Sequence, residues 1–180
     1  MTPEEARLVI AHGARLDAWA ATVSRFLGRQ LPDWQEVLEE HRQDEIRHAE
    51  MLKGLEAPDV SGAYARAIGT TALEQNPTSN AVVLNLVERR SVIQFHVAAR
   101  VLPRAEARIL RQIAREETRH VRHGEDILRA LKPSASLVAE AGRALTGWDQ
   151  EHLGLTHQTL RKLAALNTHC VYETIRAVRS

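Results

Sequence analysis

Residues 44–48 read DEIRH, and residues 116–120 read EETRH. Both stretches consist of an acidic residue, Glu, a variable residue, Arg and His. On a helix, residues three apart lie on one face, so the Glu and the His of each stretch can point at one place. A carboxylate and an imidazole that converge in this way form half of a metal site. Two such half-sites facing each other would form a dinuclear site.

Chance alone explains part of this pattern. With 17 Glu and 9 His in 180 residues, composition predicts about one Glu-x-x-His match. The repeated acid before the Glu and the repeated Arg before the His make the pair more specific. The alternative is two charged helix faces exposed to solvent. The two interpretations differ in whether other helices supply the missing ligands.

Composition limits the class of protein. The chain of 180 residues is long enough for one domain with a sizeable core, and abundant Ala, Leu, Arg and Glu favour helices. The formal net charge of +1 gives no sign of a nucleic-acid partner. The single Cys170 excludes an internal disulfide and a Cys-x-x-Cys site. Without an apolar run of 18 residues or a secretory segment, we expect a cytoplasmic protein with no membrane partner.

Apolar periodicity predicts four long helices joined by a short, a long and a short connection, at about residues 3–30, 34–55, 80–102 and 104–131. A shorter helix is expected near 63–74, within the long crossover. Thr2, Asp33 and Ser79 are the expected caps of the first three long helices. We find no strand pattern.

The last part of the chain, residues 133–180, is also helical by pattern, with breaks expected near Gly147, Gly154 or Asn167. The sequence therefore predicts an all-α fold in a single domain, 1–180. Residues 1–132 would form a four-helix bundle with one long crossover, and residues 133–180 a C-terminal helical extension.

The second hairpin brings a further carboxylate to the level of EETRH. Its turn centres near residue 102 or 103, so Glu117 and His120 lie level with residue 86 or 87, close to Glu88. Glu88 is the only acid in a helix that is apolar nearly all round, and such a helix belongs in the centre of a bundle. A buried carboxylate there needs a partner, which would be either a metal ion or an arginine.

The first hairpin likewise brings a carboxylate to the level of its Glu-x-x-His stretch, DEIRH. Its turn centres near residue 31 or 32, which places Glu45 and His48 level with residue 16 or 17. Asp17 is the only acid there. His12 lies nearer the centre of the apolar stripe of this helix but about one turn too low. Asp17 is therefore the expected ligand from this helix, with His12 or no residue at all as the alternatives.

These residues resemble the ligands of the ferritin-like di-iron carboxylate superfamily, in which two helices give one carboxylate each and two give Glu-x-x-His. The resemblance covers residues 1–132, and most members have Glu where this chain has Asp17. It implies a ferritin-like four-helix bundle. It also implies bridging carboxylates, terminal carboxylates and one histidine per metal, which would be Glu45 and Glu117, Asp17 and Glu88, and His48 and His120 respectively.

The resemblance further implies two iron ions, with manganese or a mixed pair as alternatives because the same ligands bind all three. An enzyme of this kind would activate O2 to oxidise a small organic substrate, for example as a monooxygenase, and would need an external electron donor. An iron-storage ferroxidase, a rubrerythrin-like peroxidase, a manganese catalase and a metal-free helical scaffold are the alternatives. The tail would wall a substrate cavity or form a homodimer contact.

The residues beside the expected ligands also repeat. Asp44 and Glu116 precede them, and Arg47 and Arg119 lie between each Glu and His. These four side chains would suit partners that orient the histidines or balance charge. A solvated helix face is the alternative for all four.

Overall fold

The computed structural model describes residues 1–60, 62–73 and 76–179, and over these ranges the chain is all-helical, without strands. The elements are α1 (Pro3–Gln30), η1 (Pro32–Trp34), α2 (Gln35–Lys53), α3 (Ala63–Leu73), α4 (Pro77–Ala98), α5 (Arg104–Leu131), α6 (Ala135–His152) and α7 (His157–Arg179). The predicted helix end at residue 74 and the chain end at 180 lie outside the described residues. No described helix has the length and apolar character needed to cross a membrane.

One of the three predicted caps is confirmed. The Thr2 hydroxyl accepts a hydrogen bond from the Glu5 backbone N–H at 3.2 Å, and the Glu5 carboxylate accepts one from the Thr2 N–H at 2.9 Å. Such a capping box satisfies two of the helix's free N–H groups. With Pro3 at the first helical position, it explains why α1 begins where predicted.

The other two predicted caps are wrong. Asp33 lies within η1 and makes no capping hydrogen bond. The cap of α4 is Asn76, whose side chain accepts from the Ser79 N–H at 3.1 Å, so the helix begins three residues before the position expected from Ser79. Pro77 explains why Asn76 rather than Ser79 is the cap, since proline suits the first helical turn and has no N–H to leave unpaired.

The remaining helix ends also refine the prediction. Among the three candidate breaks in the tail, the chain turns at Gly154, whose φ of +65° is a left-handed conformation that favours glycine. Gly147 and Asn167 lie inside α6 and α7. Helices α2 and α4 end earlier than the predicted residues 55 and 102, because the chain continues in turns before the next segment.

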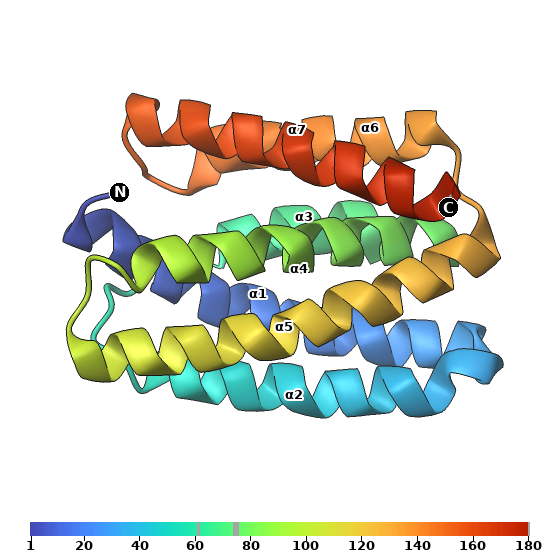
Figure 1. Ribbon diagram of the computed structural model, residues 1–180, viewed down its shortest axis with the longest axis horizontal. Coiled ribbons are helices and arrows are strands. Elements are labelled where there is room, and N and C mark those ends of the chain that lie inside the picture. The colour runs from blue at the N-terminus through green and yellow to red at the C-terminus, as the bar shows by residue number, and fades with distance from the viewer. Residues whose placement is uncertain (61, 74–75, 180) are drawn as a thin grey trace.

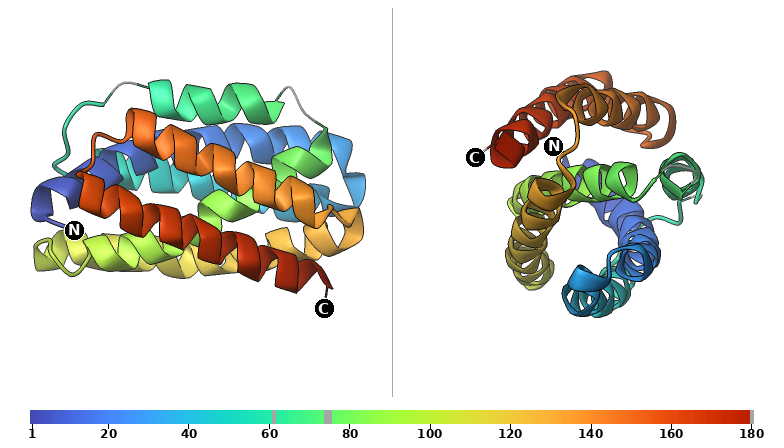
Figure 2. Two further views of the ribbon diagram at one scale, coloured as in Figure 1. Left: turned by 90° about the horizontal axis from the view of Figure 1, so that it is seen from above. Right: turned by 90° about the vertical axis from the view of Figure 1, so that its right-hand side faces the viewer.

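The four long helices of the first 131 residues form two hairpins packed side by side. Helix α1 pairs with α2 and α4 with α5, while α1 also contacts α4 and α2 contacts α5. The end-on view in Figure 2 shows these four helices around a common axis. Helix α3 lies outside them, against α1 and α4, and α6 and α7 form a further layer over α4 (Figure 1).

Two apolar clusters fill the bundle. One cluster holds Val23, Leu38, Leu84 and Leu128 among others, and the second holds Ile10, Leu52, Phe95 and Leu110 among others. On α2, α4 and α5 the predicted metal ligands lie in sequence between the two clusters, and on α1 Asp17 directly follows Leu16, the first buried member of one cluster on that helix. The candidate site is therefore enclosed by apolar layers along the bundle axis, which keeps water away from it.

The tail shares its core with the bundle. Leu145 and Leu163 belong to the same apolar cluster as Val23. A buried ion pair adds to this contact, since Arg90 Nη1 of α4 lies 2.9 Å from Asp149 Oδ1 of α6.

The same carboxylate of Asp149 accepts hydrogen bonds from the Tyr64 hydroxyl at 2.5 Å and from the Asn167 amide at 2.8 Å. Asp149 thus joins α3, α4 and α7 to α6. Removing one partner of such a buried pair costs about 3–5 kcal/mol, so the tail is an integral part of the folded chain.

Candidate metal centre

All six predicted ligand side chains come together midway along the bundle, and a seventh, His41, joins them. They come from four helices: Asp17 from α1, His41, Glu45 and His48 from α2, Glu88 from α4, and Glu117 and His120 from α5. Each is at most 4% exposed. Their ligand atoms form two groups that share one residue, Glu45.

The first group contains His41, Glu45, Glu88 and His120, whose ligand atoms all lie within 4.8 Å of one another. His41 Nε2 is 2.8 Å from Glu88 Oε1 and 3.0 Å from Glu45 Oε1. His120 Nδ1 is also 3.0 Å from Glu45 Oε1. Two carboxylates and two imidazole nitrogens therefore surround one place.

The second group contains Asp17, Glu45, His48 and Glu117, again within 4.8 Å of one another. His48 Nδ1 is 3.1 Å from Glu117 Oε1 and 4.0 Å from Glu45 Oε2. This group holds three carboxylates and one imidazole nitrogen. It is therefore more acidic than the first.

Glu45 and Glu117 each face both groups. Glu45 directs Oε1 toward His120 and Oε2 toward His48. Glu117 directs Oε1 toward His48, and its Oε2 lies 3.5 Å from His120 Nδ1. A carboxylate with one oxygen toward each of two sites has the geometry of a bridging ligand. The bridging roles of these two residues stay a prediction.

The structure decides between the candidates on α1. Asp17 belongs to the second group, whereas His12 belongs to neither. The His12 ring instead meets the ring of Tyr64 edge-on, with centroids 5.5 Å apart. His12 and Asp17 are five residues apart, so they point in different directions from the helix.

His41 is the site residue that the sequence interpretation missed. It lies four residues before Glu45, which places both on the same face of α2. The full pattern on α2 is therefore His-x-x-x-Glu-x-x-His, in residues 41–48. On α5 the corresponding position is Ile113, and the second copy of the motif gave no reason to look one turn earlier.

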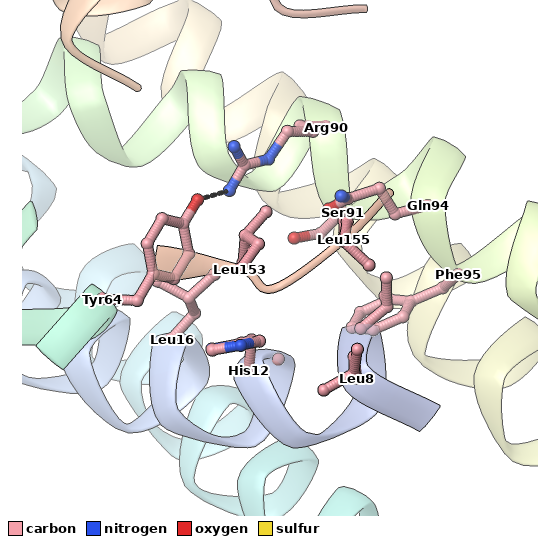
Figure 3. Close-up of a pocket in the computed structure, with 12 residues that line it drawn as sticks. Leu8, His12, Leu16, Tyr64, Arg90, Ser91, Gln94, Phe95, Leu153 and Leu155 are labelled. Atoms are coloured by element: carbon pink, nitrogen blue, oxygen red, sulfur yellow. Dashed lines mark hydrogen bonds between the residues drawn. The ribbon is translucent and has the colours of Figure 1, made fainter. Parts of the chain in front are cut away.

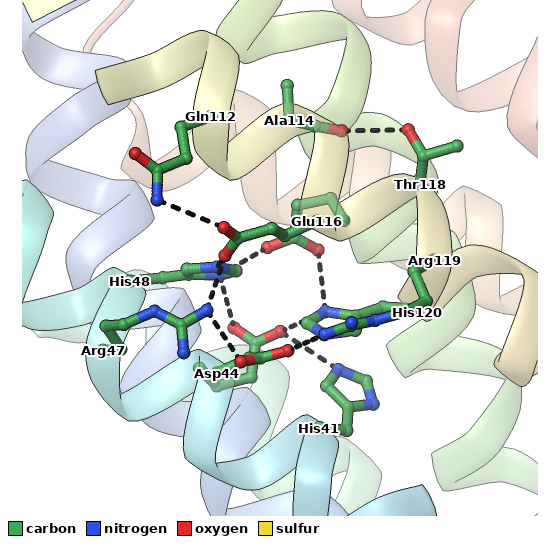
Figure 4. Close-up of polar contacts among 12 residues, drawn as sticks. His41, Asp44, Arg47, His48, Gln112, Ala114, Glu116, Thr118, Arg119 and His120 are labelled. Carbon is green, nitrogen blue, oxygen red and sulfur yellow. Dashed lines mark hydrogen bonds and ion pairs between the residues drawn. The ribbon is translucent and has the colours of Figure 1, made fainter. Parts of the chain in front are cut away.

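Each helix orients the histidine of the other. His120 Nε2 on α5 lies 3.2 Å from Asp44 Oδ2 on α2, and His48 Nε2 on α2 lies 2.7 Å from Glu116 Oε2 on α5 (Figure 4). When Nε2–H donates to the carboxylate, Nδ1 is left as an acceptor directed at the centre. Such outer carboxylates fix the tautomer and the ring orientation of a metal-binding histidine.

Arginines connect these outer carboxylates. Arg47 lies 2.7 Å from Asp44 Oδ1 and 2.6 Å from Glu116 Oε2, so it bridges the two helices, and Arg119 also pairs with Asp44. The repeated acid and Arg of the two sequence stretches thus form a network around the histidines. The alternative of two solvated faces is wrong for the acids, while both arginines are about half exposed.

The electrostatics of the centre are those of an acidic cluster that needs positive charge. Burial and the negative charges of Glu45 and Glu117 raise the pKa of Asp17 well above its usual value. Burial opposes protonation of His41, but the Glu88 and Glu45 carboxylates outweigh it and raise the pKa of His41 to about 9. Cations are favoured strongly at such a place.

Two divalent cations fit this residue set. Among the described residues, Asp17 Oδ2 and Glu88 Oε2 are buried without a hydrogen-bond partner, which is costly for carboxylate oxygens. Four carboxylates balance the charge of two divalent ions. The mixture of carboxylate and imidazole donors suits iron or manganese.

Comparisons of the chain with models of protein families, with curated proteins and with solved structures found no match. The seven side chains are therefore interpreted from their own chemistry and geometry.

Proposed function

We propose that this chain is a ferritin-like di-iron protein that uses O2 to oxidise a small organic substrate. The observation that carries the proposal is the pair of buried ligand groups sharing Glu45, halfway along four packed helices. Two ferrous ions held by these ligands would bind O2 and supply two of the four electrons for its reduction, and the substrate would supply the other two. An external electron donor would return the ions to the ferrous state. Manganese or a mixed pair remains an alternative, because the same residue types bind it.

The two ion positions are unequal. If Glu45 and Glu117 were shared, Glu88, His41 and His120 would complete one position, and Asp17 and His48 would complete the other. The position beside Asp17 would then have fewer protein ligands and could take an exogenous molecule. Catalytic metal sites generally keep such an open position, whereas structural sites are closed by protein ligands.

The surrounding residues hold this geometry and limit access by water. Asp44 and Glu116 keep the Nε2 proton on His120 and His48 and so present Nδ1 to the centre. Arg47 joins these two carboxylates on the outer side of α2 and α5.

The proposal is tested by anaerobic loading of the full chain with Fe(II), followed by metal analysis, exposure to O2 and native mass measurement. We expect two iron ions per chain, a transient visible absorption after O2 and a monomer or dimer. Many irons per chain within a large shell would instead indicate storage. Turnover of hydrogen peroxide without use of O2 would indicate a peroxidase or a manganese catalase.

A matched pair of variants tests the ligand assignment. We expect His120→Ala and Glu117→Ala to lose bound metal while their helix content stays near that of the wild type. His123→Ala is the control, because His123 lies on α5 one turn beyond His120 but in neither ligand group. Two retained iron ions in the first two variants would overturn the assignment.

A further inference from the structure

A small cavity lies between α1 and α4, on the side of these helices away from α2 and α5 (Figure 3). The loop between α6 and α7 closes it with Leu153 and Leu155. Leu16, which directly precedes Asp17, and Ser91, three residues after Glu88, also line it. The cavity is therefore about one helical turn from the terminal ligands on both helices.

Two buried polar atoms that face this cavity have no partner in the described part of the chain. They are Nδ1 of His12 and Nε of Arg90, on side chains that are 6% and 1% exposed. Burying such atoms unpaired is costly. The other nitrogens of Arg90 are occupied by Asp149 and Tyr64. The cavity therefore offers hydrogen-bonding positions that the protein itself does not fill.

These positions consist of one donor and one acceptor. Arg90 Nε–H is a donor only. His12 Nδ1 is the second position, and in a neutral ring it accepts a hydrogen bond when Nε2 carries the proton. Burial lowers the pKa of His12 more than the Leu153 backbone raises it, so the ring is neutral.

The cavity carries no net charge. Arg90 is balanced by Asp149, with Nη1 between 2.9 and 3.1 Å from both carboxylate oxygens. Tyr64 donates to the same carboxylate and is un-ionised. A charged ligand would lose its hydration here without gaining an opposite charge. An uncharged polar group loses less and can use both free positions.

A largely apolar groove continues from the cavity to the surface between α4 and α7. It shares Gln94 and Leu155 with the cavity, and Val97, Leu163 and Leu166 line it. Lys162 also lines the groove and is its one charged side chain among the described residues. The volume that the centre of a water molecule can occupy is about 20 Å³ in the cavity and about 260 Å³ in the groove. The cavity thus suits a polar group of about one or two non-hydrogen atoms, and the groove suits a larger apolar body.

We propose that the cavity and the groove together bind an uncharged amphiphile, with its apolar body between α4 and α7 and one hydroxyl or amide group between His12 and Arg90. That this molecule is also the one oxidised rests on the proposed function, but its binding does not. The tail supplies Leu153 and Leu155 at the inner end and Leu163 and Leu166 along the groove.

The probes are unbranched 1-alkanols from butanol to decanol, titrated into the metal-free full chain and followed by calorimetry and by NMR shifts of the leucine methyl groups. We expect affinity to rise with chain length, with shifts at Leu155 and Leu163. Octylammonium should bind at least 10-fold more weakly than 1-octanol, and octanoate should do so in Lys162→Met, which removes the cation that lines the groove. Equal or tighter binding of either ion in these measurements, or no binding along the alkanol series, would overturn the proposal.

A bulky side chain at the place where the cavity meets the groove tests where the alkanol binds. Gln94→Trp should weaken 1-octanol binding at least 10-fold, whereas Gln94→Ala should keep it. Thr22→Trp is the matched control, because Thr22 lines a groove between α1 and α2 on another face. Unchanged binding in Gln94→Trp, or an equal loss in Thr22→Trp, would place the alkanol elsewhere and contradict the proposal.

The two proposals fail separately. Alkanol binding in a chain that takes up no iron would leave the pocket in place and remove the di-iron function. Two bound iron ions without alkanol binding would support the di-iron function and remove the proposed pocket. Circular dichroism of each variant shows that a loss of binding does not come from unfolding.

Discussion

Helix α2 presents three side chains to the centre, His41, Glu45 and His48, whereas α5 presents only two, Glu117 and His120. The position on α5 that corresponds to His41 is Ile113, which is fully buried in an apolar cluster. The two helices therefore contribute unequally although their motifs repeat. A repeated motif establishes that two half-sites face each other, and the residue one turn away decides whether they are equivalent.

The carboxylates that contact the histidines from outside the centre are also unequal, and the one on α2 is again the better enclosed. Asp44 on α2 is buried and pairs with His120, Arg47 and Arg119. Glu116 on α5 has a side chain that is 24% exposed, and it pairs with His48 and Arg47. The carboxylate that contacts His120, Asp44, is thus more deeply buried than Glu116, which contacts His48. The following predictions test this inequality, beginning with the largest effect.

Replacement of the shared ligand should have the largest effect. Glu45→Ala removes the residue common to both groups, so we expect both ions to be lost. A ligand present at 100 times its dissociation constant stabilises by about 2.7 kcal/mol, and about 2–4 °C of Tm corresponds to each kcal/mol in a chain of this size. The metal-dependent gain in Tm, about 5–10 °C per ion, should therefore disappear.

Thermal unfolding with and without a chelator measures this effect in the wild type and the variant. Glu50→Ala on the exposed face of α2 is the control and should keep the full gain. Two bound ions in Glu45→Ala would contradict the shared role.

The variant His41→Ile makes α2 resemble α5. It removes a nitrogen from the group that contains Glu88 and leaves the group that contains Asp17 unchanged. We expect one of two binding steps to weaken by more than about 10–100-fold, the range known for partners that only support metal ligands, because His41 would itself be a ligand, and we expect the other step to change little. Anaerobic titration calorimetry with Mn(II) resolves the two steps. An equal loss in both steps would show that the two positions are equivalent after all.

Neutralising the outer carboxylates should have intermediate effects. Asp44→Asn should act on His120, and Glu116→Gln on His48, because each carboxylate contacts the histidine of the opposite helix. We expect up to about 100-fold weaker metal binding for Asp44→Asn and a smaller loss for the more exposed Glu116. Nitrogen-15 NMR of the imidazoles identifies the histidine affected. A response of the histidine on the same helix would refute the crossed arrangement.

The smallest effects are expected for the arginines. Arg47 and Arg119 have side chains that are 48% and 46% exposed, and exposed ion pairs contribute about 0.2–1 kcal/mol. Arg47→Gln and Arg119→Gln should have similar effects, because Arg47 pairs with Glu116 and Arg119 pairs with Asp44 and Glu40, so both side chains join α2 to α5. Urea unfolding at low and at high ionic strength measures both losses of stability, and each loss should shrink at high salt. A loss of several kcal/mol would show that one of these pairs behaves as a buried one.

The sequence was sufficient to find Asp17 and Glu88 because helix rise is constant and both hairpin turns are short. Counting back from each turn therefore places residues at equal height. His41 could not be chosen in this way, since any residue four positions before Glu45 shares its face. Whether that face meets a neighbouring ligand depends on the rotation of α2 against α4 and α5, which spacing within one helix does not determine.

Two other features of the structure differ from the sequence interpretation or were absent from it. One is the cap of α4, which depends on neighbouring residues, and the other is the set of contacts of Asp149, which joins residues far apart in the chain. Asn76 and Ser79 can both cap a helix, and only the fit of Pro77 to the first turn separates them. The partners of Asp149 lie 85, 59 and 18 residues away in the chain. No periodicity connects residues so far apart, so the attachment of the tail could be seen only in the folded chain.

The position of Asp149 late in the chain has a consequence during synthesis. When residue 132 has been added, every ligand of the centre is present, but the Asp149 carboxylate that pairs with Arg90 is not. Ribosomes add about 5–20 residues per second, so the interval until residue 149 lasts about 1–3 s. Over that time the nascent bundle holds an uncompensated guanidinium at a position that the finished protein buries. A stop codon after residue 132 would make this state permanent, and its product would be a target for chaperones and proteases.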